Sequence, residues 1–167
     1  MRNLVIVGAA LCLAACATAV GTAYGPADSK GYGFAETRVE DDRYRVSFAG
    51  DGATPIAVVE DYALLRAAEI AVENGYDWFR VVGRTLDEQE KGGVGIGAGL
   101  GGGGRNVGVG VSGNVGKVGA RRFYTARLEV LFGKGEKPES QPGGEVYDAR
   151  SVVDSIRGRM NDAAPAQ

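Results

Sequence analysis

Alternation of apolar and polar positions along the chain predicts four β-strands. The clearest case is the segment 43–49, where Tyr44, Val46 and Phe48 alternate with charged or small polar residues. Side chains alternate between the two faces of a strand, so one face of this segment is apolar and the other charged, as in a half-buried antiparallel strand. Similar patterns, bounded by turn residues, predict strands over residues 32–39, 43–49, 76–85 and 122–132.

One long helix is expected between the second and third strands. Thr54 offers an N-capping hydroxyl, Pro55 suits the first helical position, and Gly75 suits a left-handed residue just after the helix. The helix therefore runs to about Asn74, with alanines on its apolar face that allow close approach to a sheet. Its polar side carries Arg66, Glu69 and Glu73, and we interpret the two glutamates, one turn apart, as solvated charge.

The order of elements, β-β-α-β-β, indicates the α+β class. It predicts an antiparallel sheet with one helix packed across it, forming a domain over residues 31–133. Apolar residues return at helical spacing within residues 145–160, which predicts a C-terminal amphipathic helix. A linker rich in Lys, Glu, Pro and Gly (134–144) precedes this helix, and a frayed tail (161–167) follows it.

A glycine-rich insertion, residues 91–120, separates the last two predicted strands. Residues 92–119 contain 14 glycines, and branched apolar residues alternate with many of them. This pattern predicts either a β-hairpin with one flat glycine face or a disordered loop. A formal G-x-G-x-x-G occurs at residues 97–102, but the strand, helix and acidic residue that a dinucleotide site requires are not in place around it. We therefore expect no cofactor.

Charge is unevenly distributed, although the formal net charge is only −2. From Lys91 to Leu128 there are six basic residues and no acidic one. As a hypothesis, the insertion extends the last two strands outward, and its basic flank meets anionic groups such as phosphorylated lipid or wall polymer. The expected partners are a membrane, and an envelope protein or anionic envelope polymer; nucleic acid is not expected.

The residue types that most often perform catalysis are missing. The chain has no histidine, and neither of its two cysteines would remain a free thiol after the N-terminal processing described below. The aromatic string 76–79 could line a ligand groove, but Trp78 and Phe79 are expected to pack on opposite faces of a strand. We therefore expect no enzyme activity and assign no catalytic, cofactor-binding or metal-binding residue.

The N-terminus has the pattern of an export signal. Arg2 precedes an uncharged apolar run of 12 residues, 4–15, which is too short to span a bilayer.

Two cleavage sites compete. Residues 17–19, Ala-Thr-Ala, fit the ordinary signal peptidase, which would release a soluble protein without either cysteine. Residues 13–16, Leu-Ala-Ala-Cys, resemble the bacterial lipobox, and we favour this site because it falls where the apolar run ends.

In the lipoproteins that this motif resembles, the cysteine becomes the first residue of the mature chain and carries a diacylglyceryl group and a further acyl chain. The resemblance implies that residues 1–15 are a cleaved signal peptide, that Cys16 is lipidated, and that residues 16–30 are a flexible tether. Several acyl chains anchor stably, whereas one gives only reversible binding. Ala17, rather than Asp, follows the cysteine, which in enterobacterial lipoproteins implies export to the outer membrane.

The core of the chain also resembles a group of small, uncharacterised proteobacterial lipoproteins. The resemblance lies in residues 36–82, ETRVEDDRYRVSFAGDGATPIAVVEDYALLRAAEIAVENGYDWFRVV, followed by a glycine-rich insertion before the last strand. It implies an envelope location and brings no catalytic residues.

Two functions follow as expectations. The first is a lipid-anchored, non-catalytic lipoprotein of the outer membrane, facing the periplasm, with a structural, interaction or sensing role. The alternative is a periplasmic module that binds a small ligand between sheet and helix.

Overall fold

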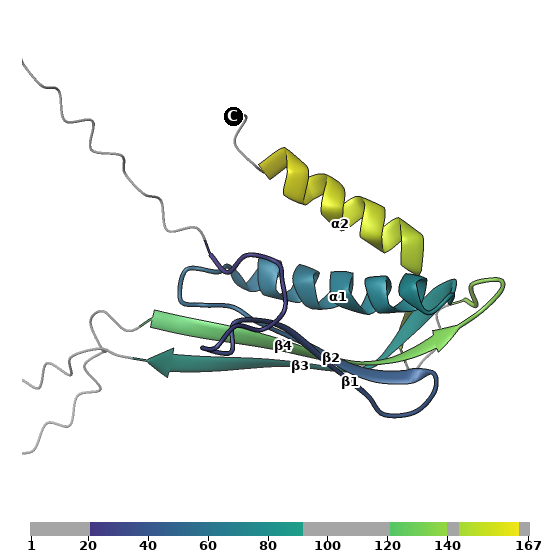
Figure 1. Ribbon diagram of the computed structural model, residues 1–167, viewed down its shortest axis with the longest axis horizontal. Coiled ribbons are helices and arrows are strands. Elements are labelled where there is room, and N and C mark those ends of the chain that lie inside the picture. The colour runs from purple at the N-terminus through teal and green to yellow at the C-terminus, as the bar shows by residue number, and fades with distance from the viewer. Residues whose placement is uncertain (1–20, 92–120, 140–143, 164–167) are drawn as a thin grey trace, which may run out of the picture.

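The protein is an α+β structure in which one sheet carries two helices on a single face. The computed structural model describes residues 21–91, 121–139 and 144–163 (Figure 1). Cys16 and almost all of the glycine-rich insertion therefore lie outside the described residues. The five strands are antiparallel and lie in the order β1-β2-β4-β3-β5. The elements are β1 (Gly33–Arg38), β2 (Arg43–Ala49), α1 (Ile56–Glu73), β3 (Trp78–Lys91), β4 (Arg121–Gly133), β5 (Glu145–Asp148) and α2 (Ala149–Ala163).

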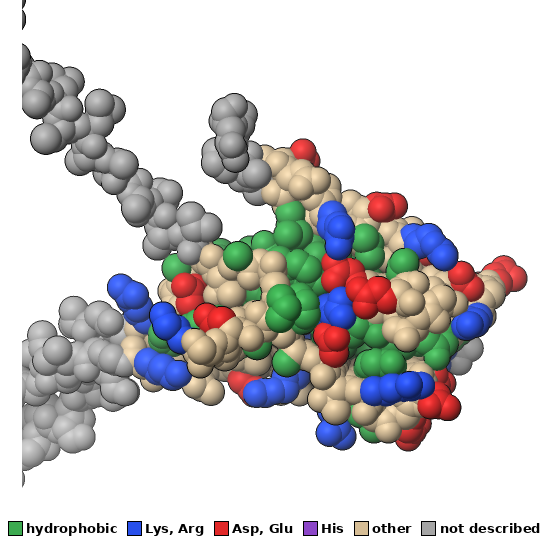
Figure 2. Space-filling view, in the orientation of Figure 1, with side chains coloured by type: hydrophobic (Ala, Val, Ile, Leu, Met, Phe, Trp, Pro, Cys, Tyr) green, Lys and Arg blue, Asp and Glu red, His purple; other side chains and the backbone are tan. Residues whose placement is uncertain are grey.

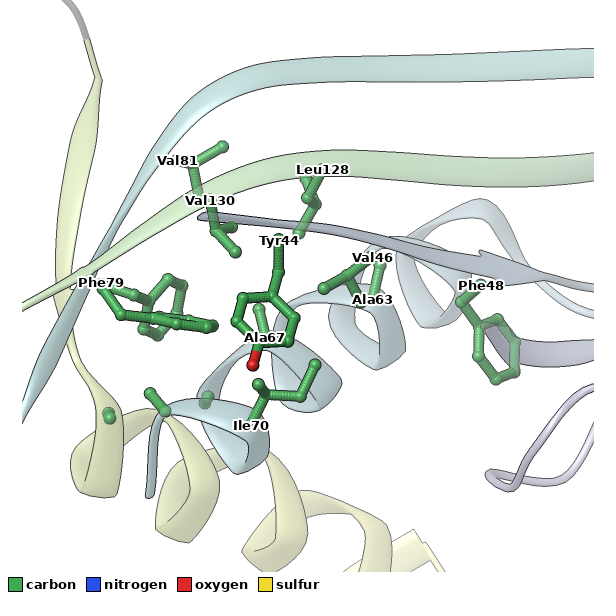
Figure 3. Close-up of a cluster of buried hydrophobic side chains, with 14 of the residues drawn as sticks. Tyr44, Val46, Phe48, Ala63, Ala67, Ile70, Phe79, Val81, Leu128 and Val130 are labelled. Carbon is green, nitrogen blue, oxygen red and sulfur yellow. The ribbon is translucent and has the colours of Figure 1, made fainter. Parts of the chain in front are cut away.

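The helix α1 lies between the sheet and α2 (Figure 1). Figure 3 shows core side chains of β2, β3 and β4 gathered against α1. Phe48, Phe79 and Val130 are completely buried in this layer. Small residues allow α1 to be buried on more than one side, which explains why so many of its positions are inaccessible: Val59, Ala63, Leu65, Ala67, Ala68, Ile70 and Ala71.

The expected α1 boundaries are confirmed at the C-terminus and differ at the N-terminus. Gly75 has φ of +71°, and its N–H donates to the carbonyl of Val72, as expected of a left-handed residue that closes a helix. Thr54, however, does not cap α1. Its hydroxyl donates to Asp51 at 2.7 Å and accepts the N–H of Thr22 at 2.7 Å, because the N-terminal segment packs here.

The expectation of a helix over residues 145–160 is wrong for its first turn. Glu145–Asp148 forms β5, which pairs with the start of β3. The Tyr147 ring stacks on Phe79 with centroids 5.3 Å apart, and this tertiary contact favours the extended conformation. The helix begins at Ala149, with the Asp148 carboxylate accepting the N–H of Ser151 at 2.8 Å.

The strands β3 and β4 are longer than expected. They pair continuously from Trp78 opposite Gly133 to Lys91 opposite Arg121, with a bulge between Val81 and Gly83. The two strands thus lead directly to the insertion, whose own residues, 92–120, lie outside the described part.

Trp78 and Phe79 lie on opposite faces, as expected. Phe79 is in the core, whereas the Trp78 ring covers Gly133 on the other face of the sheet. A Cβ at residue 133 would lie 2.0 Å from Cζ2 of Trp78, so the ring occupies the space of a side chain.

Two Gly→Ala substitutions should therefore have opposite effects. Gly133→Ala should lower the free energy of unfolding by about 1–3 kcal/mol, because the indole must be displaced. Gly158→Ala, in α2 with nothing within 4 Å of the new Cβ, should raise it by about 1 kcal/mol through helix propensity. Urea denaturation followed by circular dichroism measures both. Equal effects of the two substitutions would contradict this account of Trp78.

Candidate functional site

The N-terminal segment after the predicted lipidation site is docked on the domain. Residues 16–30 were expected to be a flexible tether, but residues 21–31 make defined contacts. The Asp51 N–H donates to the Thr22 hydroxyl at 2.8 Å, and the Phe34 N–H donates to the Gly25 carbonyl at 2.8 Å. The tether expectation is therefore wrong for residues 21–30, while 16–20 lie outside the described residues.

Tyr24 fixes this segment against the helical side of the sheet. Its ring lies 5.2 Å from those of Phe34 and Tyr62 and 6.4 Å from that of Phe48, measured between centroids. Its hydroxyl donates to Glu69 of α1 at 2.5 Å. Burial, followed by the hydrogen bond to Glu69, raises the pKa of Tyr24, so the phenol stays protonated and remains a donor.

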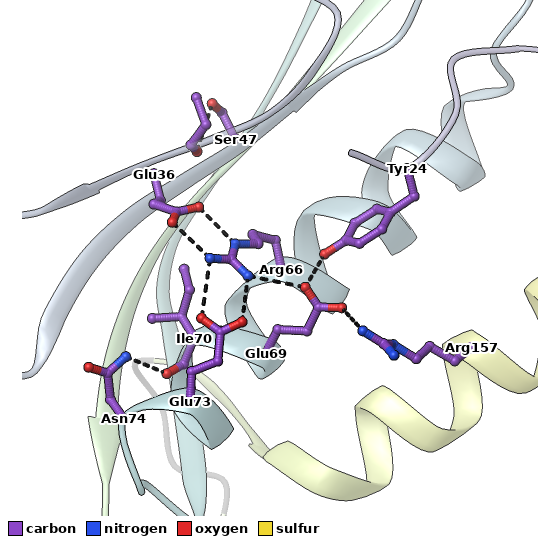
Figure 4. A network of polar contacts seen from close by, with 10 residues as sticks. Tyr24, Glu36, Ser47, Arg66, Glu69, Ile70, Glu73, Asn74 and Arg157 are labelled. Carbon is purple, nitrogen blue, oxygen red and sulfur yellow. Dashed lines mark hydrogen bonds and ion pairs between the residues drawn. The ribbon is translucent and has the colours of Figure 1, made fainter. Parts of the chain in front are cut away.

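Glu69 is the centre of this cluster (Figure 4). One carboxylate oxygen accepts from Tyr24 and from Arg66 at 3.2 Å, and the other accepts from Arg157 of α2 at 2.7 Å. Glu69 is only 7% exposed, so its interpretation as solvated charge is wrong. The cause is tertiary: the N-terminal segment and α2 cover a helix position that periodicity assigns to the polar face.

Arg66 connects the same cluster to the sheet. Its guanidinium binds Glu36 of β1 with two contacts of 2.8 Å and also reaches Glu73 at 2.9 Å. The hydrogen bond from Arg66 lowers the pKa of Glu36, and these carboxylates raise the pKa of Arg66. We call Tyr24, Glu36, Arg66, Glu69, Glu73 and Arg157 the carboxylate cluster.

The docking shortens the distance available to the predicted anchor. A free tether from residue 16 to residue 30 would reach roughly 50 Å, whereas the five residue steps from Cys16 to Gly21 span at most about 18 Å. Gly21 lies beside Thr54, where α1 begins, and Gly52 in the same loop lies beside Arg121, the first residue of β4. The N-terminal segment, the end of β3 and the start of β4 therefore lie at the same end of the sheet, as Figure 1 shows.

The second candidate site is the sheet face that neither helix covers, which we call the open face. Arginines are frequent on it, and Figure 2 shows basic side chains along this side of the molecule. Arg43 pairs with Glu129 at 3.3 Å, and Arg127 pairs with Asp87. The charged positions along the middle of this face are Arg43, Arg45, Arg80, Asp87, Arg127 and Glu129, and Lys91 and Arg121 lie on the same face where β3 ends and β4 begins.

A shallow hollow of about 310 Å³ lies in the open face, across β1, β2, β4 and β3. Small side chains and the bulge at Gly83 form its floor, and Arg45, Arg127 and Glu129 line it. Its two arginines are suited to an anionic group.

A third feature is a pair of adjoining grooves between the helices and the edge of the sheet. Their volumes are about 200 Å³ and about 330 Å³, and Asp61, Leu64 and Tyr147 line both. Arg159 pairs with Asp61 at 2.8 Å across this region. The aromatic string 76–79 does not line either groove, so the sequence did not point to them.

Tyr24→Phe tests whether Tyr24 holds the N-terminal segment. Removal of a hydrogen bond to a charged group should lower the free energy of unfolding by about 1.5–3 kcal/mol. Tyr32→Phe is the control, because within the described residues the Tyr32 hydroxyl has no hydrogen-bond partner, although its ring stacks on Phe123. Limited proteolysis should cut residues 21–31 faster in the first variant only. Equal cleavage rates would contradict the role of Tyr24.

Glu36→Gln tests the contact with Arg66 through its pH dependence. The pKa of Glu36 is lowered in the folded state, so the carboxylate stabilises the fold above about pH 4.5, and this contribution is lost as the pH falls through the lower folded value. The variant should be less stable than the wild type at pH 7, and the difference should narrow below about pH 4. Urea titrations at pH 7 and pH 3 measure this, with Glu40→Gln as an exposed control. A difference independent of pH would exclude the ionic contribution.

Among residues 21–91, 121–139 and 144–163, no group of three or more His, Cys, Asp or Glu side chains could hold a metal ion. Within the same residues, no helix is both long and apolar enough to cross a membrane. Comparison of the chain with protein-family models, curated proteins and solved structures found no match.

Proposed function

We propose that this protein is a lipid-anchored, non-catalytic lipoprotein of the outer membrane that faces the periplasm and acts through interaction with other envelope components. The observation that carries the proposal is the Leu-Ala-Ala-Cys motif at residues 13–16, placed where the apolar run ends. Lipidation of Cys16 would hold a charged, water-exposed domain at a bilayer surface.

The docked N-terminal segment supports an interaction role. A domain held within about 18 Å of its anchor is positioned at the membrane instead of sampling the whole space that a long tether allows. Anchorage and the carboxylate cluster would together present a rigid domain in a restricted position. Such restriction suits a protein that connects two envelope components.

The alternative function, a periplasmic module for a small ligand, is favoured by the paired grooves. Their volumes, about 200 Å³ and about 330 Å³, suit a small molecule, and Leu64 and Tyr147 provide an apolar surface. A ligand retained through purification under native conditions would support this alternative.

Cys16→Ala tests the lipid anchor. The wild-type chain should be recovered with membranes, and mass spectrometry should find a mature N-terminus at residue 16 that carries acyl groups. Cys16→Ala should remove the acylated species and prevent cleavage at this position. Cys12→Ala is the matched control, since Cys12 lies inside the apolar run and its substitution should leave processing unchanged. An unacylated wild-type chain that begins at Val20 would disprove the anchor.

A further inference from the structure

We propose that the open face of the sheet binds carboxylate groups of the cell-wall polymer, and that Arg45 and Arg80 are the two principal contacts. The peptide stems of this polymer carry carboxylates, which arginine binds through paired N–H donors. The proposal names the partner of the envelope protein described above and rests on that proposed location. The binding itself is a property of the folded domain and can be measured separately.

Part of the positive charge on the open face has no ion-pair partner. Along the middle of this face there are two carboxylates, Asp87 and Glu129, and they already pair with Arg127 and Arg43. In the described part of the chain, Arg45 and Arg80 have no ion-pair partner. The face therefore has an excess of positive charge in a protein whose formal net charge is −2.

Three hydrogen-bond donors near this face lack acceptors. Nε of Arg43, Nε of Arg80 and Nε1 of Trp78 are buried, and none of them has a hydrogen-bond partner among the described residues. Arg43 and Arg80 both lie opposite Leu131, so a single row across β2, β4 and β3 holds them. Buried donors without acceptors are unfavourable, and an acceptor-only group such as a carboxylate satisfies them.

The spacing of the arginines suits a polymer with repeated anionic groups. Arg43 and Arg45 are two residues apart on one strand, which places them about 7 Å apart on the same face. Arg45 and Arg127 are diagonal neighbours on paired strands, at about 7–8 Å. The hollow beside Arg45 has a floor of small residues, including Ala35, that leaves room for an incoming chain.

The position of the open-face donors in the sheet favours binding to the cell wall rather than to the bilayer that holds the predicted anchor. The N-terminal segment meets the domain near Ala49 and Thr54, where β2 ends and α1 begins. Arg43 and Trp78 lie at the opposite end of the sheet, since β2 begins and β3 begins there. From Ala49 to Arg43 the strand alone extends about 20 Å. The unpartnered donors thus lie at the end of the sheet remote from the predicted anchor.

Co-sedimentation with purified, protein-free wall sacculi tests the proposal. The full-length protein, purified in detergent, is mixed with sacculi and centrifuged, and detergent keeps the lipid anchor from contributing. We expect the wild type to sediment with the sacculi. The double variant Arg45→Ala/Arg80→Ala should raise the apparent Kd at least tenfold, and Arg45→Glu, at an exposed position, should do so without any change in the core.

The matched control is Arg150→Ala/Arg159→Ala, which removes the same charge from α2. Both arginines are exposed, and each pairs with one carboxylate away from the open face. This control should stay within twofold of the wild type. Absence of wild-type binding, unchanged binding by the open-face variants, or equal loss in the control would each overturn the proposal.

Competition identifies the chemistry of the partner. Soluble wall peptides should release the bound protein, whereas glycerol phosphate at the same concentration should not. Release by glycerol phosphate alone would assign the face to lipid headgroups and overturn the proposal, as would a dimer that the open-face variants abolish. If the N-terminal mass shows no acylation while sacculus binding persists, the proposed anchor fails and this inference stands.

Discussion

The burial of one carboxylate, Glu69, joins three parts of the chain that are distant in sequence. Removing a carboxylate from water is unfavourable by several kcal/mol unless donors replace the lost hydration. Here Tyr24 supplies a hydroxyl, Arg66 a contact within α1, and Arg157 a contact from α2. Each of these donors lowers the free-energy cost of burying the Glu69 carboxylate. The N-terminal segment and α2 both cover this carboxylate, so we expect the docking of each to depend on the other. The position of the predicted anchor relative to the domain follows from this one site.

The one-sided architecture has a second consequence. Because α1 packs on one face of the sheet and α2 lies over α1 on the same side, the alternate side chains of β2, β3 and β4 must remain in contact with solvent or a partner. Arg43 and Arg45 occupy such positions and alternate with the core residues Tyr44 and Val46. The residues that make the core and those that make the candidate surface are thus specified by the same alternation.

This alternation explains what the sequence could predict. Period-two patterns identified the core face of β2 and β4, and Gly75 marked the end of α1, because both signals are local. The carboxylate cluster was missed because burial of Glu69 depends on Tyr24 and Arg157, which lie 45 and 88 residues away. The segment 21–30 has the composition of a linker, yet tertiary hydrogen bonds fix it. Only an isolated tyrosine within a Gly/Pro-containing stretch hinted at a docked segment. Cys16, the sole predicted site residue, rests on sequence alone.

Electrostatics distinguishes the two candidate binding regions. In the grooves beside α2, two of the charged side chains already have partners: Asp61 pairs with Arg159, and Arg84 pairs with Glu145. A charged ligand that entered there would have to displace these pairs and would gain little in return. On the open face, an incoming carboxylate meets Arg45 and Arg80 without displacing an existing partner, and it supplies acceptors to donors that lack them. Binding of an anionic partner is therefore more favourable at the open face than at the paired side chains of the grooves.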